Sequence, residues 1–355
     1  MKTVPTANVR VPGNPFGVAS SADGRWSFVA LTGSVEVMAN RKAKTPTGGP
    51  DRFVVPVPVH RVKLGRFPFP VGARLTHDGR HLLFADSNGA VVINVAKAER
   101  GKRGAIAGTL SAKGQGGAIE VVVSPDDRFA FVSMEETDSL AVFDLHKAFA
   151  NGFRPSDFVG TVPLGIAPVG LAVSPDGKLI YATSELNPRG GHAGTLSVID
   201  LRQAETKPAR AVVATVSAGC NPVRVITSAD GRVVWVTARG GDAVLGFSAA
   251  QLLHHPRHAQ VAKVQVGSAP VGLALTDDGK RLVVADSNRF QTKGASADLA
   301  VLDVRAALAG RPALLGLIKT GKFPREVTVI PHTQTLLVGD FGSDRVQAVD
   351  VGRLP

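Results

Sequence analysis

The chain has 355 residues, of which 44% are hydrophobic, and it carries a formal net charge of +12 at neutral pH. This length and composition suit one large domain with a substantial core. The single cysteine, Cys220, excludes an internal disulfide. Because no run of about 18 apolar residues occurs, the sequence predicts no membrane-spanning helix.

The first predicted element is a lone strand at 7–11, and a unit that recurs along the whole chain follows it. Each copy contains an apolar strand, an Asp-Gly turn or a variant of it, and a second apolar strand. Asp-Gly supplies the positive backbone torsions that a two-residue hairpin needs. The clearest copy spans 168–183, and a third strand follows it at 195–201. The turn position recurs about every 50 residues, at Gly24, Gly79, Asp127, Gly177, Gly231, Gly279 and Thr333.

Each repeat unit has room for about four short strands. In the second unit we place them at 73–76, 81–85, 90–95 and 105–110. Four strands in each of seven units predict an all-β fold, a seven-bladed β-propeller with antiparallel blades around a central channel. A solenoid built from the same repeats is the alternative.

The two ends of the chain favour the closed ring over the solenoid. The last unit ends at 346–351 after only three strands, and the lone strand at 7–11 can supply the fourth. Pairing the two segments would hide two sheet edges that are otherwise exposed. We therefore expect one propeller domain over residues 1–355, closed by the N-terminal strand in the last blade.

The repeated pattern Pro-x-Gly-x-Ala-x-Ser-x-Asp-Gly-Lys-x-x-Tyr/Val-Ala-x-Ser, followed by Leu-Ser-Val-Ile-Asp-Leu, resembles the YVTN/YncE-like seven-bladed β-propellers of the lactonase-like superfamily. The similarity extends over nearly the whole chain. The Trp-Asp ending of WD40 blades and the double glycine of kelch blades are missing. The resemblance implies the propeller fold, but it leaves the function open, since such families include binding proteins, surface proteins and lactonase-like hydrolases.

The cellular location stays open at this point. The resemblance implies an exported protein, periplasmic or secreted. The first residues, Met-Lys-Thr-Val-Pro-Thr, contain no apolar signal core.

The position seven residues before each turn points to a site in the channel. Glycine occupies it in four copies, which is consistent with crowded backbone near the axis. An arginine and two carboxylates occupy it in the other three, a combination that predicts a site for an anionic or polar ligand. The alternative is an interblade ion-pair network that plugs the channel. The charged residues of this position are Glu120, Arg224 and Glu326.

Further candidates for ligand binding follow the second strands or lie in two expanded loops, at 185–194 and 288–298. Both loops belong to the face opposite the Asp-Gly turns, and expansion on one face marks a binding side. The additional candidate ligand-binding residues are Asp86, Glu135, Glu185, His192, Arg239, Asp286 and Asp340.

Motifs for metal, phosphate or nucleophilic chemistry are missing from the sequence. No His-x-x-x-His or Cys-x-x-Cys spacing, P-loop or Gly-x-Ser-x-Gly elbow occurs, and we predict no metal and no cofactor. Whether the protein is an enzyme stays open. If it is a lactonase-like hydrolase of sugar lactones or related esters, Arg224 would anchor the carbonyl or carboxylate, and Glu120 or Glu326 would activate water.

Three functional hypotheses follow. The first is a monomeric binding propeller that holds a small polar or anionic ligand, or a protein or peptide partner, at the channel mouth. The second is the lactonase-like hydrolase at the same mouth. The third is weak binding of polyanions or nucleic acid by the basic turn side, although the aromatic residues, 5% of the chain, do not interleave with it. The basic residues of the turns are Arg25, Arg80, Arg128, Lys178, Arg232 and Lys280.

Overall fold

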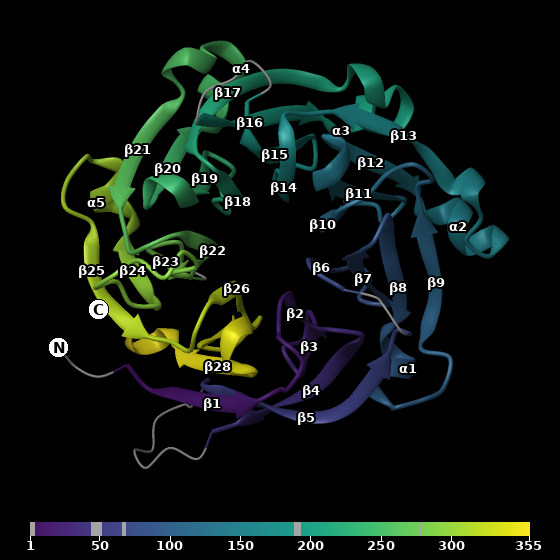
Figure 1. Ribbon diagram of the computed structural model, residues 1–355, viewed down its shortest axis with the longest axis horizontal. Coiled ribbons are helices and arrows are strands. Elements are labelled where there is room, and N and C mark those ends of the chain that lie inside the picture. The colour runs from purple at the N-terminus through teal and green to yellow at the C-terminus, as the bar shows by residue number, and fades with distance from the viewer. Residues whose placement is uncertain (1–3, 44–51, 66–68, 188–192, 277) are drawn as a thin grey trace.

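The computed structural model describes residues 4–43, 52–65, 69–187, 193–276 and 278–355. Within these residues the strands form seven antiparallel sheets of four strands, arranged as blades around a central axis (Figure 1). The first strand of each blade lies nearest the axis and the fourth lies at the rim. The predicted seven-bladed β-propeller is therefore confirmed.

The strands of the first four blades run from β2 to β17. Blade 1 contains β2 (Val18–Ser20), β3 (Trp26–Leu31), β4 (Ser34–Lys42) and β5 (Val54–Lys63). Blade 2 contains β6 (Ala73–Leu75), β7 (His81–Asp86), β8 (Gly89–Asn94) and β9 (Ile106–Ser111). Blade 3 contains β10 (Ala118–Val123), β11 (Phe129–Met134), β12 (Ser139–Asp144) and β13 (Phe158–Pro163). Blade 4 contains β14 (Ile166–Val173), β15 (Leu179–Leu186), β16 (Ala193–Asp200) and β17 (Val212–Cys220).

The last three blades complete the ring. Blade 5 contains β18 (Pro222–Thr227), β19 (Val233–Ala238), β20 (Ala243–Ser248) and β21 (Gln260–Gln265). Blade 6 contains β22 (Pro270–Leu275), β23 (Arg281–Asp286), β24 (Asp298–Asp303) and β25 (Leu314–Lys319). Blade 7 contains β26 (Pro324–Val329), β27 (Thr335–Asp340), β28 (Arg345–Asp350) and, as its rim strand, β1 (Thr6–Arg10).

The ring closes as the sequence predicts. Strand β1 pairs antiparallel with β28, with Thr6 opposite Val349 and Arg10 opposite Arg345. The edge of β28 is therefore covered by a strand from the other end of the chain, which removes an exposed row of backbone donors and acceptors.

Short helices join the third and fourth strands of blades 2 to 6. Each begins directly after the third strand, where an Asn, Asp or Ser side chain accepts a hydrogen bond from the backbone N–H three residues on. The basic segment after β8 thus begins with a helix capped by Asn94. The helices are α1 (Val95–Glu99), α2 (Leu145–Asn151), α3 (Leu201–Thr206), α4 (Ala249–His254) and α5 (Val304–Leu308). Single 3-10 turns are η1 (Glu135–Thr137), η2 (Pro155–Asp157), η3 (Pro208–Arg210), η4 (Arg239–Gly241), η5 (Pro256–His258), η6 (Phe341–Ser343) and η7 (Val351–Arg353).

The Asp-Gly turns differ from the two-residue hairpin expected above. In blade 4 only Gly177 has a positive φ, of 71°, and Asp176 does not. The Ser174 backbone N–H donates to the Leu179 carbonyl, so that four residues lie between the closing pair. The Asp176 carboxylate accepts from the Ser174 hydroxyl at 2.6 Å, and this Ser/Thr-x-Asp-Gly contact recurs in blades 1, 2, 3, 5 and 6. The aspartate therefore stabilises the turn through its side chain rather than through its own torsions.

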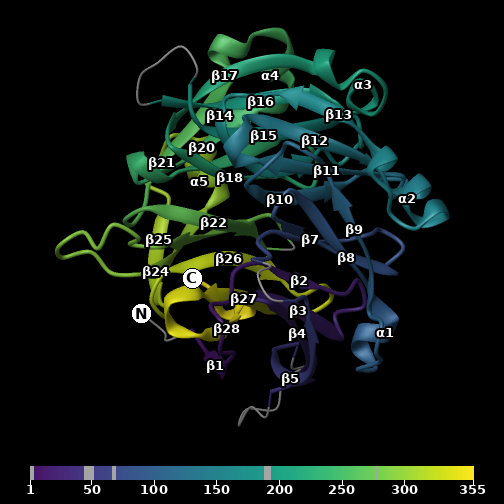
Figure 2. The same ribbon diagram turned by 45° about the vertical axis from the view of Figure 1, so that its right-hand side comes forward.

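The core lies between neighbouring blades. One buried cluster, for example, combines Val122, Phe131 and Leu140 of blade 3 with Leu171 and Ile180 of blade 4. Figure 2 shows the blades standing side by side, each sheet facing the next. Because apolar side chains fill these faces, the inner ends of the first strands are held rigidly around the channel. In the described part of the chain, no helix is long and apolar enough to cross a membrane.

Candidate ligand site in the central channel

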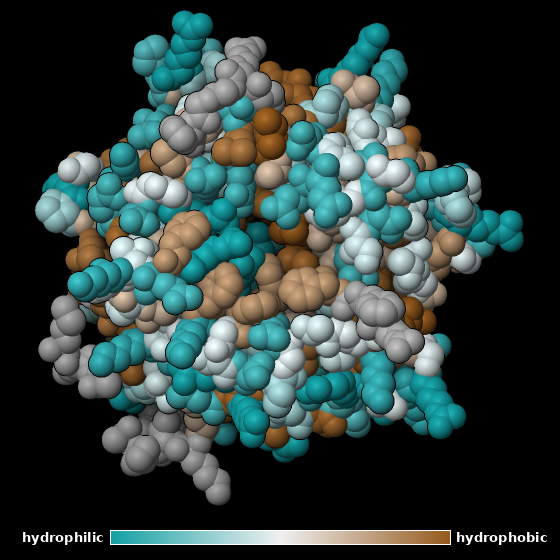
Figure 3. All heavy atoms as spheres, viewed as in Figure 1, coloured by the Kyte–Doolittle hydropathy of each residue, from teal (hydrophilic) through white to brown (hydrophobic). Residues whose placement is uncertain are grey.

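The channel has two openings with different walls. We call the end surrounded by the Asp-Gly turns the turn face, and the opposite end, surrounded by the loops that follow the second strands, the loop face. A cavity of about 620 Å³ opens on the turn face and one of about 580 Å³ on the loop face. Figure 3 shows a hollow at the centre of one face, where hydrophilic side chains lie beside hydrophobic ones.

A buried apolar collar, formed by Ile119, Val169, Val223 and Val271, lies where the two cavities approach each other. Each of these residues stands eight positions before the turn of its blade. Three of them line the loop-face cavity, while Glu120, which follows Ile119, lines the turn-face cavity. The collar thus separates two chemically distinct spaces, and Arg224 is a wall residue of both.

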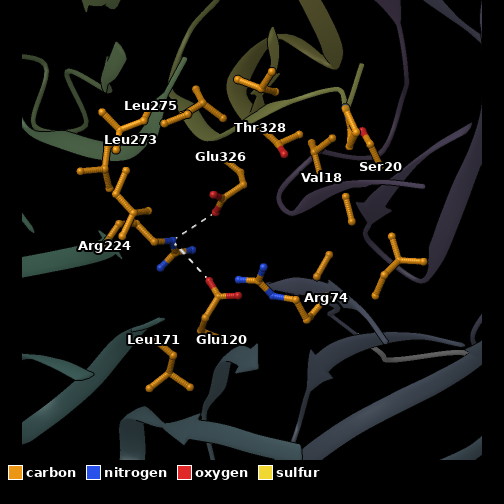
Figure 4. Close-up of a pocket in the computed structure, with 18 of the residues that line it drawn as sticks. Val18, Ser20, Arg74, Glu120, Leu171, Arg224, Leu273, Leu275, Glu326 and Thr328 are labelled. Carbon is orange, nitrogen blue, oxygen red and sulfur yellow. Dashed lines mark hydrogen bonds and ion pairs between the residues drawn. The ribbon is translucent and has the colours of Figure 1, made fainter. Parts of the chain in front are cut away.

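The structure brings together the three charged residues of the predicted channel position. Arg224 Nε lies 3.1 Å from Glu326 Oε2 and 3.5 Å from Glu120 Oε2 (Figure 4). The Arg224 and Glu120 side chains are buried, with exposed fractions of 6% and 9%, and Glu326 is partly buried, with 19% exposed. They come from β18, β10 and β26, so the ion pairs connect three blades. The interblade ion-pair network is therefore present, and a ligand at these residues stays a prediction.

Burial and charge act in opposite directions within this triad. The pKa of Glu120 is raised to about 7, because burial outweighs the opposing charge of Arg224 and the Glu326 carboxylate adds to the upward shift. Burial also lowers the pKa of Arg224, but the two carboxylates outweigh it and the net shift is upward. The Nη1 and Nη2 atoms of Arg224 are buried, and neither has a hydrogen-bond partner among the described residues. The guanidinium is thus held by charge while most of its donors stay unused.

On the loop face, arginine side chains meet aromatic rings. The guanidinium carbon of Arg325 lies 4.0 Å from the ring centroid of Phe16 and 4.8 Å from that of Phe323. Burial, together with the neighbouring charges of Arg224, Arg289 and Arg239, lowers the pKa of Arg325 to about 9. Cation–π contacts favour the charged form in such a setting. Arg325 therefore stays cationic at neutral pH although its neighbours oppose its charge.

Two of the loop-face arginines have no carboxylate within ion-pair distance among the described residues. Arg239 is paired, since its Nη2 lies 2.6 Å from Glu185 Oε2. Arg289 and Arg325 instead contact aromatic rings through cation–π interactions, and both line the loop-face cavity. Unpaired guanidinium groups at a cavity wall are suited to bind carboxylate or phosphate oxygens.

Comparison with known proteins agrees with this architecture. A family profile described as "Lactonase, 7-bladed beta-propeller" matches residues 75–289, which is more than half of the chain. The chain belongs to this lactonase propeller family. No curated protein matches the sequence of this lactonase-family propeller.

Solved structures resemble this lactonase-family propeller in fold alone. Hydrazine synthase of Kuenenia stuttgartiensis superposes with a TM-score of 0.72 at 17% identity, over 97% of either chain. The Cps50 (Swd1) β-propeller domain of Myceliophteria thermophila superposes with a TM-score of 0.69 at 15% identity, over 98% of this chain and 100% of the other.

Sequence reasoning did not single out Arg325, although a signal was present. Six of the seven copies carry an apolar residue eight positions before the turn, and the last copy carries Arg325. A charge at this otherwise apolar position is a departure from the repeat. Glu120, Arg224 and Glu326 depart from it in the same way at the next position, where the other copies have glycine. Of the aromatic partners of Arg325, Phe16 occupies the same repeat position in blade 1, and Phe323 stands two residues before Arg325. The six apolar residues are Phe16, Val71, Ile119, Val169, Val223 and Val271.

Several predicted ligand-binding carboxylates do lie at the loop-face cavity. Glu135, Glu185 and Asp86 line its wall together with Arg239. Burial raises the pKa of Glu135, the Glu185 carboxylate adds to the shift, and nearby arginines oppose it. A partly buried carboxylate beside unpaired guanidinium groups can accept a proton from a bound water.

Asp286 and Asp340 are turned away from this cavity and line neither cavity wall in the described part of the chain. Asp286 accepts from the backbone N–H of Gly267 at 2.9 Å, and Asp340 accepts from that of Gly321 at 2.9 Å. Each carboxylate thereby fixes the segment that leads into its blade. Asp86 makes the equivalent bond with Phe69 N, at 2.7 Å. His192 lies outside the described residues.

The turn face is less basic than the residue count predicts. Five of its six basic turn residues lie between 2.6 and 3.7 Å from the aspartate of their own turn. These exposed pairs largely cancel in charge. In the described part of the chain, no three His, Cys, Asp or Glu side chains converge as a metal site would require. The pairs are Arg25–Asp23, Arg80–Asp78, Lys178–Asp176, Arg232–Asp230 and Lys280–Asp278.

Proposed function

We propose that the protein binds an anionic lactone, or a related sugar-acid ester, in the loop-face cavity and hydrolyses it. The observation that carries the proposal is the convergence of Arg289 and Arg325, both without a carboxylate partner among the described residues, on a cavity of about 580 Å³. Membership of the lactonase family supports the ester chemistry. The YVTN/YncE-like subtype remains a prediction supported by the repeat pattern.

The chemistry assigns separate roles to the charged groups. Arg325 stabilises the negative charge that develops on the carbonyl oxygen when water attacks the lactone. Glu135 takes the proton from that water, and its raised pKa makes it a stronger base than an exposed glutamate. When the ring C–O bond breaks, Glu135 returns the proton to the departing alkoxide oxygen. Arg289 and the Arg239–Glu185 pair hold the anionic part of the substrate.

The test is turnover of a panel of sugar lactones by the full chain, followed as acid release at constant pH below 7.5. Glu135→Gln should lower kcat by about a hundredfold or more with little change in KM. Glu205→Gln is the matched control, because burial also raises the pKa of Glu205 but the residue lies on α3 at the rim. Arg325→Met should raise KM and lower kcat together.

A thermal-shift measurement with the same panel separates hydrolysis from binding alone. A ligand that binds the native state raises the melting temperature by mass action. A shift with a lactone or sugar acid that Arg325→Met removes, without any turnover, would replace the hydrolase by a binding propeller. If neither a shift nor turnover is seen with any anionic compound, both forms of the proposal are wrong.

A further inference from the structure

The turn-face cavity has a composition of its own. Its wall near the channel centre is apolar and includes Val18, Leu171, Leu273 and Leu275, which surround the opening in Figure 4. Its volume of about 620 Å³ lies within the range of about 300–1,000 Å³ that small-molecule sites occupy. The collar separates this space from the loop face, and the lactonase chemistry proposed above does not use it.

Charged groups lie at the floor of this apolar space. Figure 4 shows Arg74, Arg224, Glu120 and Glu326 pointing toward one another. Arg224 is 95% buried, and its two amino groups have no hydrogen-bond partner in the part of the chain that the structure describes. Arg74 is exposed to the cavity and lies close enough to Glu120 to oppose the shift of its pKa. The unused donors of the floor therefore belong to guanidinium groups, which favours an anionic ligand group.

We propose that the turn-face cavity is a second ligand site, which binds a small monocarboxylic acid with an apolar body. The carboxylate lies between Arg74 and Arg224, and the hydrocarbon part contacts Leu171 and Leu273. A carboxylate supplies the acceptors that the guanidinium groups lack. The apolar wall is suited to an aliphatic chain and offers little to a sugar. The site has walls of its own, because Arg74 and the apolar residues belong to the other end of the channel, although Arg224 also lines the loop-face cavity.

Charge balance makes this binding depend on pH. The floor holds two guanidinium groups and two carboxylates, so an added carboxylate leaves an excess of one negative charge in a buried place. Protonation of Glu120 on β10 removes this excess and releases its 3.5 Å contact with Arg224, which frees that guanidinium for the ligand. The charged groups that face Glu120 are Arg224 on β18, Glu326 on β26 and Arg74 on β6, and His77 in the turn after β6 also lines the cavity.

The experiment is calorimetric titration of the full chain with hexanoate at pH 6 and pH 8, with hexanol as the probe that lacks a carboxylate. Since the pKa of Glu120 is about 7, binding coupled to its protonation should be about tenfold weaker at pH 8. In the Glu120→Gln variant the side chain is neutral at both pH values, so hexanoate should bind as tightly at pH 8 as at pH 6. His77→Gln should keep the tenfold dependence.

Two further variants locate the bound hexanoate. Arg74→Met, at an exposed residue, should weaken binding about tenfold, whereas Arg325→Met on the loop face should leave it unchanged. The opposite result, loss in Arg325→Met and none in Arg74→Met, would place hexanoate on the loop face and overturn the second site. Equal binding of hexanol, or no binding of hexanoate to the wild type at pH 6 up to millimolar concentration, would also overturn it. None of these outcomes depends on lactone turnover.

Discussion

The two ends of the channel use arginine in opposite ways. On the turn face, Arg224 lies between two carboxylates from other blades, and its pKa is raised although the side chain is buried. On the loop face, Arg325 lies between two aromatic rings and near other arginines, and its pKa falls to about 9. The residue type is the same. What differs is the sign of the neighbouring charge.

Because of this difference, the charge of Arg224 stabilises the folded ring, whereas the charge of Arg325 destabilises it. Arg224 compensates two buried carboxylates, and its loss would leave both without a partner. Arg325 has no compensating carboxylate among the described residues, and folding brings it close to like charges. A charge that is unfavourable in the folded state and lines a cavity is typical of a functional site. Substitutions at the two positions should therefore act in opposite directions on stability.

The largest effect is expected for Arg224→Met. Removing the cation leaves Glu120 and Glu326 buried together, which should cost about 3–5 kcal/mol of unfolding free energy at pH 8. Arg224 opposes the upward shift of the Glu120 pKa, so without it that pKa rises further, and the loss should shrink toward pH 5, where Glu120 is protonated. Urea unfolding at the two pH values measures this. The triple variant with Glu120→Gln and Glu326→Gln should recover most of the stability, and a loss independent of pH would contradict the role of charge.

Buried and exposed aspartates also differ in the direction of their pKa shifts. The substitution Asp286→Asn tests the buried case. Burial raises the pKa of Asp286 to about 8, with Asp298 adding to the shift, so the folded state retains a proton that the unfolded chain releases near pH 4. The unfolding free energy of the wild type should therefore fall as pH rises from about 4 to 8. Asp286→Asn, which is neutral at every pH, should remove that dependence, which amounts to several kcal/mol.

Asp278 provides the matched control with the opposite sign. The Thr276 hydroxyl, the Lys280 backbone N–H and the Lys280 ammonium lower the pKa of this exposed turn aspartate to about 2. Its contribution is present above pH 4 and is lost as the pH falls through 2. Asp278→Asn should therefore alter stability only in acid. If both substitutions altered the unfolding free energy over the same pH range, the assignment of a buried proton to Asp286 would be wrong.

The fold could be predicted closely from the sequence, because the apolar strands and the turns between them recur in every repeat. The closing strand was expected at 7–11 and lies at Thr6–Arg10, and the second strand of blade 2 was expected at 81–85 and lies at His81–Asp86. The turn geometry was wrong, because Asp-Gly is compatible with both loop lengths. The Ser or Thr two residues before the aspartate favours the longer, four-residue loop, because its hydroxyl donates a hydrogen bond to the aspartate carboxylate. The spacing of the turns alone does not reveal this contact.

The candidate site was only partly predictable for a related reason. Repeat alignment brought Glu120, Arg224 and Glu326 to one layer, because equivalent positions in a ring share their distance from the axis. It could not show that Asp286 turns to the backbone of Gly267, or that Phe16 from blade 1 stacks on Arg325 from blade 7. Such side-chain directions depend on contacts between segments that are far apart in the chain. A departure from the repeat indicates where to look, and the packing decides what the residue does.

A moderate effect of opposite sign is expected for Arg325→Met. Because burial and like charges disfavour the charged form of Arg325, the apolar side chain should raise the unfolding free energy by about 1 kcal/mol, or the melting temperature by about 1 °C. Thermal unfolding in parallel with Lys322→Met, a substitution of a more exposed cation nearby, measures the difference. A clear loss of stability would mean that the stacking on Phe16 and Phe323 outweighs the repulsion, and that Arg325 is structural.

The smallest effect is expected for Lys178→Ala on the turn face. Lys178 Nζ lies 3.6 Å from Asp176 Oδ2, and the two side chains are 79% and 57% exposed. Water and salt screen such a pair, so the unfolding free energy should change by less than about 0.5 kcal/mol. Because the aspartate already compensates the lysine, affinity for a single-stranded oligonucleotide should hardly change either. A severalfold loss of affinity, with the slope of log affinity against log salt concentration reduced by about one, would instead show that the lysine contacts phosphate, and would revive polyanion binding as a function of this face.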